Sequence, residues 1–146
     1  MIPLKILPHG TGLDLPGYST PESAGLDLRA AVETEIVLKP MARYAVPTGI
    51  SLALPKGYEA EVRPRSGLAF NNGITVLNTP GTVDSDFRGE LKVLLINLGE
   101  EEFTLNRGFR IAQLVVQRYE TIAFRVVDTL SDTERSTGGY GSTGIL

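Results

Sequence analysis

The chain has 146 residues, a hydrophobic fraction of 42%, a net charge of −3 and no cysteine. Its length fits one domain, and its apolar content is sufficient for one core without disulfides or a structural metal. The lack of cysteine excludes a disulfide framework and any thiolate nucleophile or thiolate metal site, and it fits a cytoplasmic location. The acidic balance argues against a nucleic-acid binder, which is usually basic.

The N-terminal segment MIPLKILPHG is not expected to be a signal peptide, because it has no basic leader and Pro8 and Gly10 interrupt its apolar run. No segment approaches the roughly 18 apolar residues that are needed to span a bilayer. We therefore expect no association with membranes.

Short segments rich in Val, Ile, Leu and Thr follow along the chain, separated by glycine and proline. Several alternate apolar and polar residues with a period of two, as in Tyr58–Arg63, which is typical of half-buried strands. Residues 92–96 and 114–116 are more continuously apolar, as expected for strands buried on both faces. The predicted strands cover residues 35–38, 44–46, 49–54, 59–63, 74–77, 90–97, 111–117 and 122–127.

One short helix is predicted at residues 66–71. Many short strands with a single short helix predict an all-β fold, a jelly-roll-like β-sandwich or barrel. Residues 131–146 are mostly Ser, Thr, Gly or charged, and they bury too little to offset an ordering cost of about 1–2 kcal/mol per residue. We therefore expect one β domain over residues 1–130 and a flexible, glycine-rich C-terminal tail over residues 131–146.

Two segments have residue types that suit phosphate binding. Ser66 and Gly67 follow Arg65 at the start of the predicted helix, where free backbone N–H groups and the positive dipole end can bind an anion. Ser66 could equally serve only as a helix cap. Residues 138–144, GGYGSTG, offer backbone N–H groups and two hydroxyls close to Arg135. Taken alone, this segment could also be a plain flexible terminus.

Acidic residues that could serve a hydrolytic reaction lie in the segment NTPGTVDSDFRG. Asp84 and Asp86 occur where the sequence reads as a β-hairpin, with its turn at residues 80–81 and a return strand beginning near Arg88. A free carboxylate has a pKa near 4, so it is ionised at neutral pH and can deprotonate a water. Both aspartates could instead be ordinary turn residues. The single histidine, His9, is expected to play no part.

Five segments have compositions that do not suit a core. They are AGLDLRA at 24–30, RPRSGLA at 63–69, NTPGTVDSDFRG at 78–89, RGFRIAQL at 107–114 and RSTGGYGSTG at 135–144. In this order and at this spacing they resemble the five motifs of the trimeric dUTP pyrophosphatase (dUTPase) family. The resemblance extends from about residue 13 to residue 144.

The resemblance implies an enzyme that hydrolyses dUTP to dUMP and pyrophosphate with Mg²⁺ as cofactor. This reaction keeps uracil out of DNA and supplies dUMP for thymidylate synthesis. Asp84 would be the catalytic residue, the general base for a water that attacks the α-phosphorus. The enzyme would be a homotrimer whose sites are each built from more than one subunit, and the tail would close over the site.

The resemblance also assigns the other site residues. Those implied for the phosphates are Arg65, Ser66, Gly67, Gln113, Arg135, Ser142 and Thr143. Those implied for uracil and deoxyribose are Asn78, Gly81, Thr82, Val83, Asp84, Phe87 and Tyr140. Asp27 would act on the magnesium ion indirectly, through its bound water, although a structural role in a strand or turn fits Asp27 nearly as well.

Three positions depart from the usual family pattern. Phe87 stands where tyrosine is usual, Phe109 where aspartate is usual, and Tyr140 where phenylalanine is usual. Phe87 keeps the aromatic ring but loses a hydroxyl, which bears on how the sugar is discriminated.

Two other functions remain open from the sequence. A dCTP deaminase of the same fold needs a glutamate as proton shuttle in the hairpin region, where no glutamate precedes Glu90. A non-catalytic trimer that binds a nucleotide or a protein partner would not require Asp84 and Arg135, and both are present.

Overall fold

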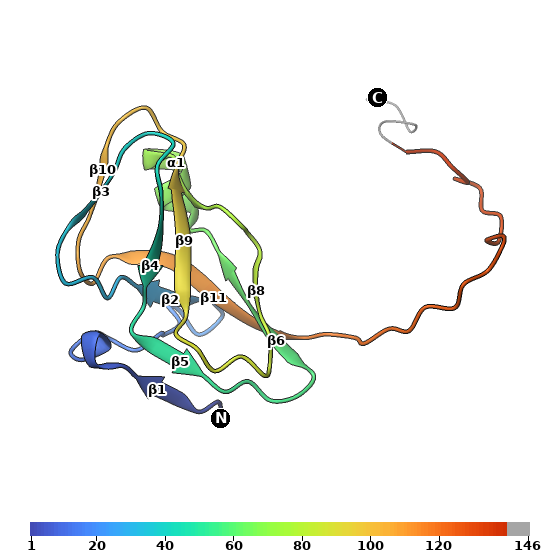
Figure 1. Cartoon of the computed structure of the whole chain (residues 1–146), viewed down its shortest axis with the longest axis horizontal. Helices are drawn as coiled ribbons and strands as arrows, with labels where there is room; N and C mark the ends of the chain where they lie inside the picture. The colour runs from blue at the N-terminus through green and yellow to red at the C-terminus, as the bar shows by residue number, and fades with distance from the viewer. Residues whose placement is uncertain (140–146) are drawn as a thin grey trace.

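The computed structural model describes residues 1–139. Its elements form a β-rich body with one short α-helix. The C-terminal segment leads away from this body after β11 (Figure 1). In chain order the elements are β1 (Leu4–Ile6), the 3₁₀ helix η1 (Pro8–Gly10), β2 (Leu26–Arg29), β3 (Ile36–Leu38), β4 (Arg43–Pro47), β5 (Ile50–Leu52), β6 (Tyr58–Arg63), α1 (Ser66–Asn72), β7 (Ile74–Val76), β8 (Gly81–Val83), β9 (Lys92–Asn97), β10 (Phe103–Leu105) and β11 (Arg110–Arg118).

The strands form four small antiparallel sheets whose neighbours are mostly distant in sequence. The largest has the strand order β2-β11-β6-β8, a second has the order β4-β9-β7, and β1-β5 and β10-β3 form two-stranded sheets. Such crossing connections between antiparallel strands are typical of jelly-roll-like sandwiches. The predicted fold class, all-β with one short helix, is confirmed.

A single apolar core lies between the sheets. Its largest fully buried side chains include Leu28, Leu95, Leu105, Ile111 and Leu114, which come from four strands of three sheets. The burial follows the period of two that the sequence indicates, because successive side chains of a strand point to opposite faces.

The largest sheet has a polar face turned away from this core, which we call the outer face. On β6 it carries Glu59, Glu61 and Arg63, which lie opposite Gln117, Val115 and Gln113 of β11. Glu59 accepts a hydrogen bond of 3.1 Å from Gln117, and Arg63 Nε donates one of 2.7 Å to Glu61. These residues are only partly exposed although they do not contribute to the core.

Helix α1 begins at Ser66 and ends one residue later than predicted. Its C-terminus is set by Gly73, which adopts a left-handed conformation with φ = 67° and donates its N–H to the carbonyls of Leu68 and Ala69. The helix connects β6 of the largest sheet to β7 of the second.

The predicted hairpin over residues 78–89 is wrong. β8 pairs with β6, whereas the next strand, β9, pairs with β4 and β7 in another sheet. Residues 84–91 therefore form a loop that passes from one sheet to the other. The alternation of side chains indicates a strand but does not determine its partner, which explains the error.

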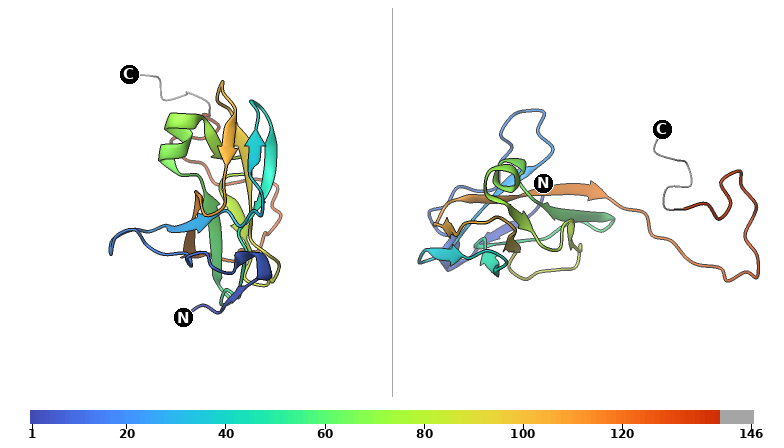
Figure 2. Two further views of the ribbon diagram at one scale, coloured as in Figure 1. Left: turned by 90° about the vertical axis from the view of Figure 1, so that its left-hand side faces the viewer. Right: turned by 90° about the horizontal axis from the view of Figure 1, so that it is seen from above.

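The strand predicted at residues 122–127 is not formed either. Ile122, Phe124 and Val126 alternate as in a strand, yet Val126 is 97% exposed, and no element is assigned between Tyr119 and Gly139. A strand needs a neighbour to bond its backbone, and this segment leads away from the body (Figure 2). β1, β2 and β10 were not among the predicted strands, and β8 was expected only as part of the hairpin.

Within the described residues of the tail, a small turn surrounds Arg135. The N–H of Ser136 donates to the Thr133 carbonyl at 3.0 Å, and Arg135 Nε donates to the Gly138 carbonyl at 2.9 Å. No helix of residues 1–139 is long and apolar enough to cross a membrane. The division into a β domain over residues 1–130 and a tail over residues 131–146 that closes over the site stays a prediction.

Candidate active site

A pocket of about 370 Å³ collects residues from three of the sequence motifs, and we call it the Arg65 pocket. It lies where β2, β11 and the start of α1 meet, beside the loop that precedes β2 and projects from the body (Figure 2). Its lining residues are Ser19, Ser23, Ala24, Gly25, Asp27, Arg63, Arg65, Ser66, Gly67, Gln113 and Val115.

Asp27 is the centre of the charged contacts in this pocket. Its Oδ1 lies 3.0 Å from Nε of Arg65, and its Oδ2 lies 3.1 Å from Nη1 of Arg110. Ser19 donates a weaker hydrogen bond to Oδ2 at 3.3 Å. The carboxylate is only 17% exposed, so these contacts are screened less than surface ion pairs. Asp27 thereby fixes two guanidinium groups at one place.

Gln113 enters the pocket from β11, and two neighbours set its position. Its Nε2 donates to the Pro64 carbonyl at 3.0 Å. A Cβ at Gly25 would collide with Oε1 of Gln113 and would lie 3.0 Å from its Cδ. Gly25 is therefore required by the close approach of the amide. A carboxamide has two N–H donors, so one donor of Gln113 is left for a ligand.

Ser66 is the first residue of α1 and makes no capping hydrogen bond through its side chain. Arg65 occupies the capping position, and it too makes no side-chain cap bond. Since the first N–H groups of a helix have no partner within it, those near Ser66 and Gly67 are available at the pocket wall. The geometry does not support the alternative in which Ser66 only caps the helix.

Asp84 lies at a second place, a shallow pocket of about 610 Å³ that we call the Asp84 pocket. It follows β8 directly, in a turn closed by a 3.2 Å hydrogen bond from the Phe87 N–H to the Asp84 carbonyl. Arg88 donates to the carbonyls of Ser85 and Phe87 at 2.7 and 2.8 Å. The other lining residues are Leu54, Lys56, Asp86 and Tyr119.

The residues that the family resemblance implies for uracil binding lie next to Asp84. Gly81, Thr82 and Val83 form β8, and a Cβ at Gly81 would lie 3.1 Å from Nδ2 of Asn78. β8 is the last strand of its sheet and pairs with β6 alone among the described strands. The side of β8 that faces away from β6 therefore presents free backbone donors and acceptors.

The two pockets are separated by the width of the largest sheet. Asp27 lies on β2 at one edge and Asp84 follows β8 at the other edge, with β11 and β6 between them. Three strand spacings correspond to about 14 Å. Within the described part of the chain no residue lines both pockets. One chain alone does not bring Asp84 to the Arg65 pocket.

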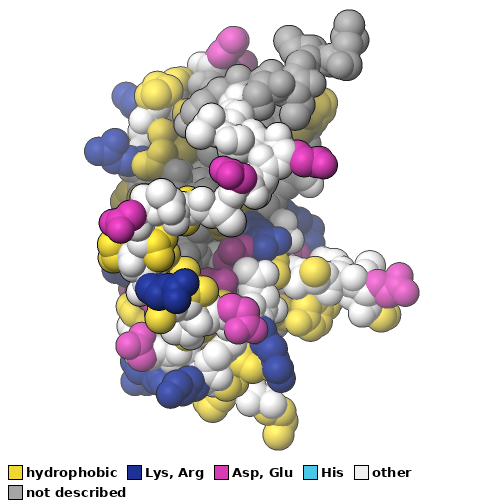
Figure 3. Space-filling view, turned by 90° about the vertical axis from the view of Figure 1, so that its right-hand side faces the viewer, with side chains coloured by type: hydrophobic (Ala, Val, Ile, Leu, Met, Phe, Trp, Pro, Cys, Tyr) yellow, Lys and Arg dark blue, Asp and Glu magenta, His cyan; other side chains and the backbone are white. Residues whose placement is uncertain are grey.

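Of the candidate site residues in the tail, only Arg135 belongs to the part of the chain that the structure describes. Arg135 is exposed, beyond the end of β11. Tyr140, Ser142 and Thr143 lie outside the described residues. On the face from which the tail leaves, basic and acidic side chains are interspersed (Figure 3).

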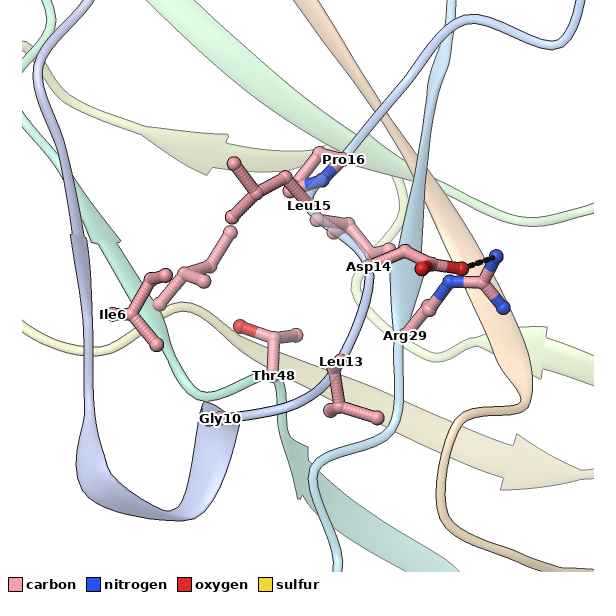
Figure 4. A pocket seen from close by; sticks show the side chains of 10 residues that line it. Ile6, Gly10, Leu13, Asp14, Leu15, Pro16, Arg29 and Thr48 are labelled. Atoms are coloured by element: carbon pink, nitrogen blue, oxygen red, sulfur yellow. Dashed lines mark ion pairs between the residues drawn. The ribbon is translucent and has the colours of Figure 1, made fainter.

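Two further features bear on a directly held metal ion and on the cavity beside η1. Among residues 1–139 no group of three His, Asp or Glu side chains could hold a metal ion directly. A cavity beside η1, where Asp14 and Arg29 form an ion pair of 2.7 Å, measures only about 10 Å³ (Figure 4). That volume is about enough for one water.

The sequence did not indicate Ser19 and Ser23 as lining residues of the Arg65 pocket, nor Arg110 as a partner of Asp27. Arg110 belongs to the fourth motif, but its register partner on β2 is Arg29 and Asp27 lies opposite Gln113, so strand pairing alone does not indicate the contact between Arg110 and Asp27. The two serines lie in a loop without periodicity, and nothing in the sequence indicates their position.

Comparison with known proteins identifies the family. The sequence model of the family described as dUTPase matches residues 12–144. The chain belongs to the dUTPase family. The deoxyuridine 5′-triphosphate nucleotidohydrolase of Treponema denticola is 63% identical over 92% of this chain and 93% of its own. That of Rhizobium rhizogenes is 56% identical over 95% of this chain and 90% of its own.

The fold has close counterparts among solved structures. A mutant of the Staphylococcus bacteriophage 80alpha dUTPase, solved with dUpNHpp, has a TM-score of 0.89 with 21% identity, over 99% of each chain. The predicted family, the predicted fold and the predicted enzyme class, a dUTP nucleotidohydrolase, are confirmed.

Proposed function

We propose that this dUTPase hydrolyses dUTP to dUMP and pyrophosphate, with Asp84 as the general base and the Arg65 pocket as the triphosphate site. The observation that carries the proposal is the pairing of Arg65 and Arg110 with one carboxylate, Asp27. This arrangement holds two guanidinium groups in advance of binding, so less side-chain entropy is lost when phosphate binds. The reaction would keep uracil out of DNA and supply dUMP for thymidylate synthesis.

The phosphate contacts would come from the residues that line this pocket. Arg65 can bind phosphate oxygens in a bidentate manner, and the free N–H of Gln113 and the backbone near Ser66 and Gly67 add neutral donors. Arg135, Ser142 and Thr143 would complete these contacts when the tail closes. Donors fixed in advance stabilise the charge that develops on the phosphates in the transition state.

The unpaired edge of β8 supports recognition of uracil through backbone hydrogen bonds. Backbone groups of Gly81, Thr82 and Val83 can donate to the uracil carbonyls and accept from N3–H, with help from Asn78. Cytosine presents the opposite pattern at two positions, and each unpaired buried group would cost about 1–3 kcal/mol. Phe87 would lie against the deoxyribose and obstruct a ribose 2′-hydroxyl, and Tyr140 would contact the base.

Asp84 would accept a proton from the attacking water. The carboxylate is exposed and lies beside the free edge of β8. Uracil bound along β8 would therefore place the 5′ side of the nucleotide near Asp84. Water attack on the α-phosphorus then expels pyrophosphate in line.

The separation of the two pockets supports a homotrimer in which Asp84 of one subunit meets the Arg65 pocket of another. The partly buried, polar outer face around Glu61 and Arg63 offers paired charges rather than an apolar core, so it can pack against another copy. Tail residues between β11 and Arg135 could span about 50 Å when extended, far enough to reach a neighbouring site. A cytoplasmic location stays a prediction from composition.

The residues of the Arg65 pocket fit Mg²⁺ only as an ion carried by the substrate. Both oxygens of Asp27 contact arginines, and the other side-chain oxygens of the pocket are neutral, namely the hydroxyls of Ser19, Ser23 and Ser66 and the amide oxygen of Gln113. Mg²⁺ commonly keeps several waters and is held through phosphate oxygens. When bound, the ion supplies charge neutralisation on the phosphates, and Asp27 would reach it through a water.

The test of the reaction is chromatography of products after purified protein and Mg²⁺ are incubated separately with dUTP, dCTP, dTTP and UTP. We expect conversion of dUTP alone, to dUMP and pyrophosphate. Deoxyuridine nucleotides formed from dCTP would instead establish a deaminase. Binding of dUTP without turnover would establish a protein that only binds the nucleotide.

The test of Asp84 compares two neighbouring aspartates. Asp84→Asn should lower kcat by about 10²- to 10⁴-fold, the usual contribution of a general base. Asp86→Asn is the matched control, since Asp86 has no assigned role, and it should retain activity. Equal losses in both variants would remove Asp84 from the proposed role.

A further inference from the structure

The aromatic ring of Phe87 lies directly over Gly89. A Cβ at Gly89 would lie 2.6 Å from Cζ and 2.9 Å from Cε2 of the ring. Contacts below 3.0 Å do not occur between carbon atoms that are not bonded, so the ring occupies the space that any side chain at position 89 would need. Only glycine permits this position of the ring.

The loop around the ring is held by its own hydrogen bonds. The N–H of Phe87 donates to the Asp84 carbonyl at 3.2 Å, which closes a turn from Asp84 to Phe87. Arg88 donates to two carbonyls of the same turn. Phe87 and Asp84 therefore belong to one short turn that is closed by a hydrogen bond. A shift of the Phe87 ring changes the position of the ring relative to the Asp84 carboxylate.

Phe87 has no hydroxyl, so its ring cannot be oriented by a hydrogen bond. The side chain is 44% exposed, which leaves one side of the ring free for a ligand. The close approach to Gly89 is one contact that limits where the ring can lie. In a chain with tyrosine at this position a hydroxyl could add a further constraint.

We propose that Gly89 is a positioning residue for the sugar selectivity of the enzyme, acting through the ring of Phe87. The inference rests on the proposed function, in which Phe87 lies against the deoxyribose and obstructs a 2′-hydroxyl. Because Gly89 has no side chain, the Cζ end of the ring can occupy this space. In this position the ring would admit deoxyribose and obstruct the 2′-hydroxyl of ribose. A methyl group at position 89 displaces the ring and opens that space.

The test is a double-mutant cycle with Gly89→Ala, Phe87→Ala and the double variant, in which kcat/KM is measured for dUTP and UTP. We expect Gly89→Ala to lower the ratio of kcat/KM for dUTP over UTP about tenfold. In the Phe87→Ala background, Gly89→Ala should lower the ratio no further. Gly17→Ala is the matched control, since a Cβ there meets only the Leu15 carbonyl at 3.8 Å, and it should leave the ratio unchanged.

Two outcomes would overturn the inference. An unchanged ratio in Gly89→Ala would show that the ring is set by other contacts. If Gly89→Ala lowered the ratio of kcat/KM for dUTP over UTP equally in the wild-type and Phe87→Ala backgrounds, Gly89 would act through the backbone. Failure of the wild-type enzyme to hydrolyse dUTP would instead overturn the proposed function, so the two failures are distinguishable.

A measurement on the wild-type protein keeps the inference testable if Gly89→Ala does not fold. The ring over Gly89 should shift the Hα resonances of Gly89 upfield in NMR spectra, and Phe87→Leu should abolish that shift. The shift should persist when dUMP binds. Its absence in the free enzyme, or its loss on binding, would contradict the proposed positioning.

Discussion

His9 Nε2 lies 2.6 Å from Oε1 of Glu90, across 81 positions of the sequence. The same oxygen accepts the N–H of Gly49 at 2.9 Å, and Glu90 is only 15% exposed. Glu90 ends the loop that carries Asp84 and Phe87. The contact therefore joins the N-terminal segment to the end of the loop formed by residues 84–91.

Removal of the imidazole should destabilise the protein. His9→Ala leaves a partly buried carboxylate with one partner fewer, so the free energy of unfolding should fall by about 1–3 kcal/mol. Urea unfolding measures this change. His9→Gln keeps a donor and should recover part of the loss. A His9→Ala protein as stable as the wild type would show that water replaces the imidazole without cost.

Asp27 should affect substrate binding through the two arginines it holds. Asp27→Ala frees Arg65 and Arg110, and kcat/KM for dUTP should fall roughly 10- to 100-fold, the cost of misplaced binding groups. The part of the loss that comes from the two arginines should remain at saturating Mg²⁺. Full recovery at high Mg²⁺ would show that Asp27 acts only on the metal, through its bound water.

A matched control for Asp27 is available in a second ion pair. Asp14 contacts Arg29 at 2.7 Å but is 79% exposed and lies outside the Arg65 pocket. Asp14→Ala should leave kcat/KM nearly unchanged, because exposed ion pairs contribute little.

A side chain at position 25 should lower activity because it would displace the amide of Gln113. In Gly25→Ala the new methyl displaces the amide of Gln113, so kcat/KM should fall about tenfold, the value of one hydrogen bond to a charged group. The combination Gly25→Ala with Gln113→Ala should be no worse than Gln113→Ala alone. Steady-state kinetics of the three variants measure the effect, and additive losses would contradict it.

Mixed assemblies should test whether a site draws on two chains. Asp84→Asn and Arg65→Ala should each be inactive alone. When the two are unfolded together and refolded at equal amounts, about one quarter of the sites should combine an intact Asp84 with an intact Arg65 from different chains. Activity assays of the mixture measure the recovery. No recovery would indicate that each site is built within one chain.

The sequence predicted the residues of the site better than their arrangement. Asp27, Arg65 and Gln113, far apart in the sequence, do line one pocket. The hairpin prediction failed because alternation along β8 indicates a strand without naming its partner. His9 was expected to play no part, since a lone histidine carries no pattern, and only the fold reveals its contact with Glu90.

The place of Arg110 was not predicted for a different reason. The family usually has an acid at position 109, where this chain has Phe109, so no partner for Arg110 could be predicted. The structure supplies Asp27 from the neighbouring strand. The pairing depends on register between β11 and β2, which includes an irregularity between Arg110 and Ala112. Such a shift is a property of the sheet and leaves no local signature.

The position of Asp84 and Asp27 at opposite edges of one sheet has a consequence for inheritance. In the proposed trimer each chain gives its base to one site and its arginines to another. A single defective chain lacking both functions would then silence two of the three sites around it. In a cell that makes intact and defective chains together, the loss of activity would exceed the defective fraction, so such an allele would act dominantly.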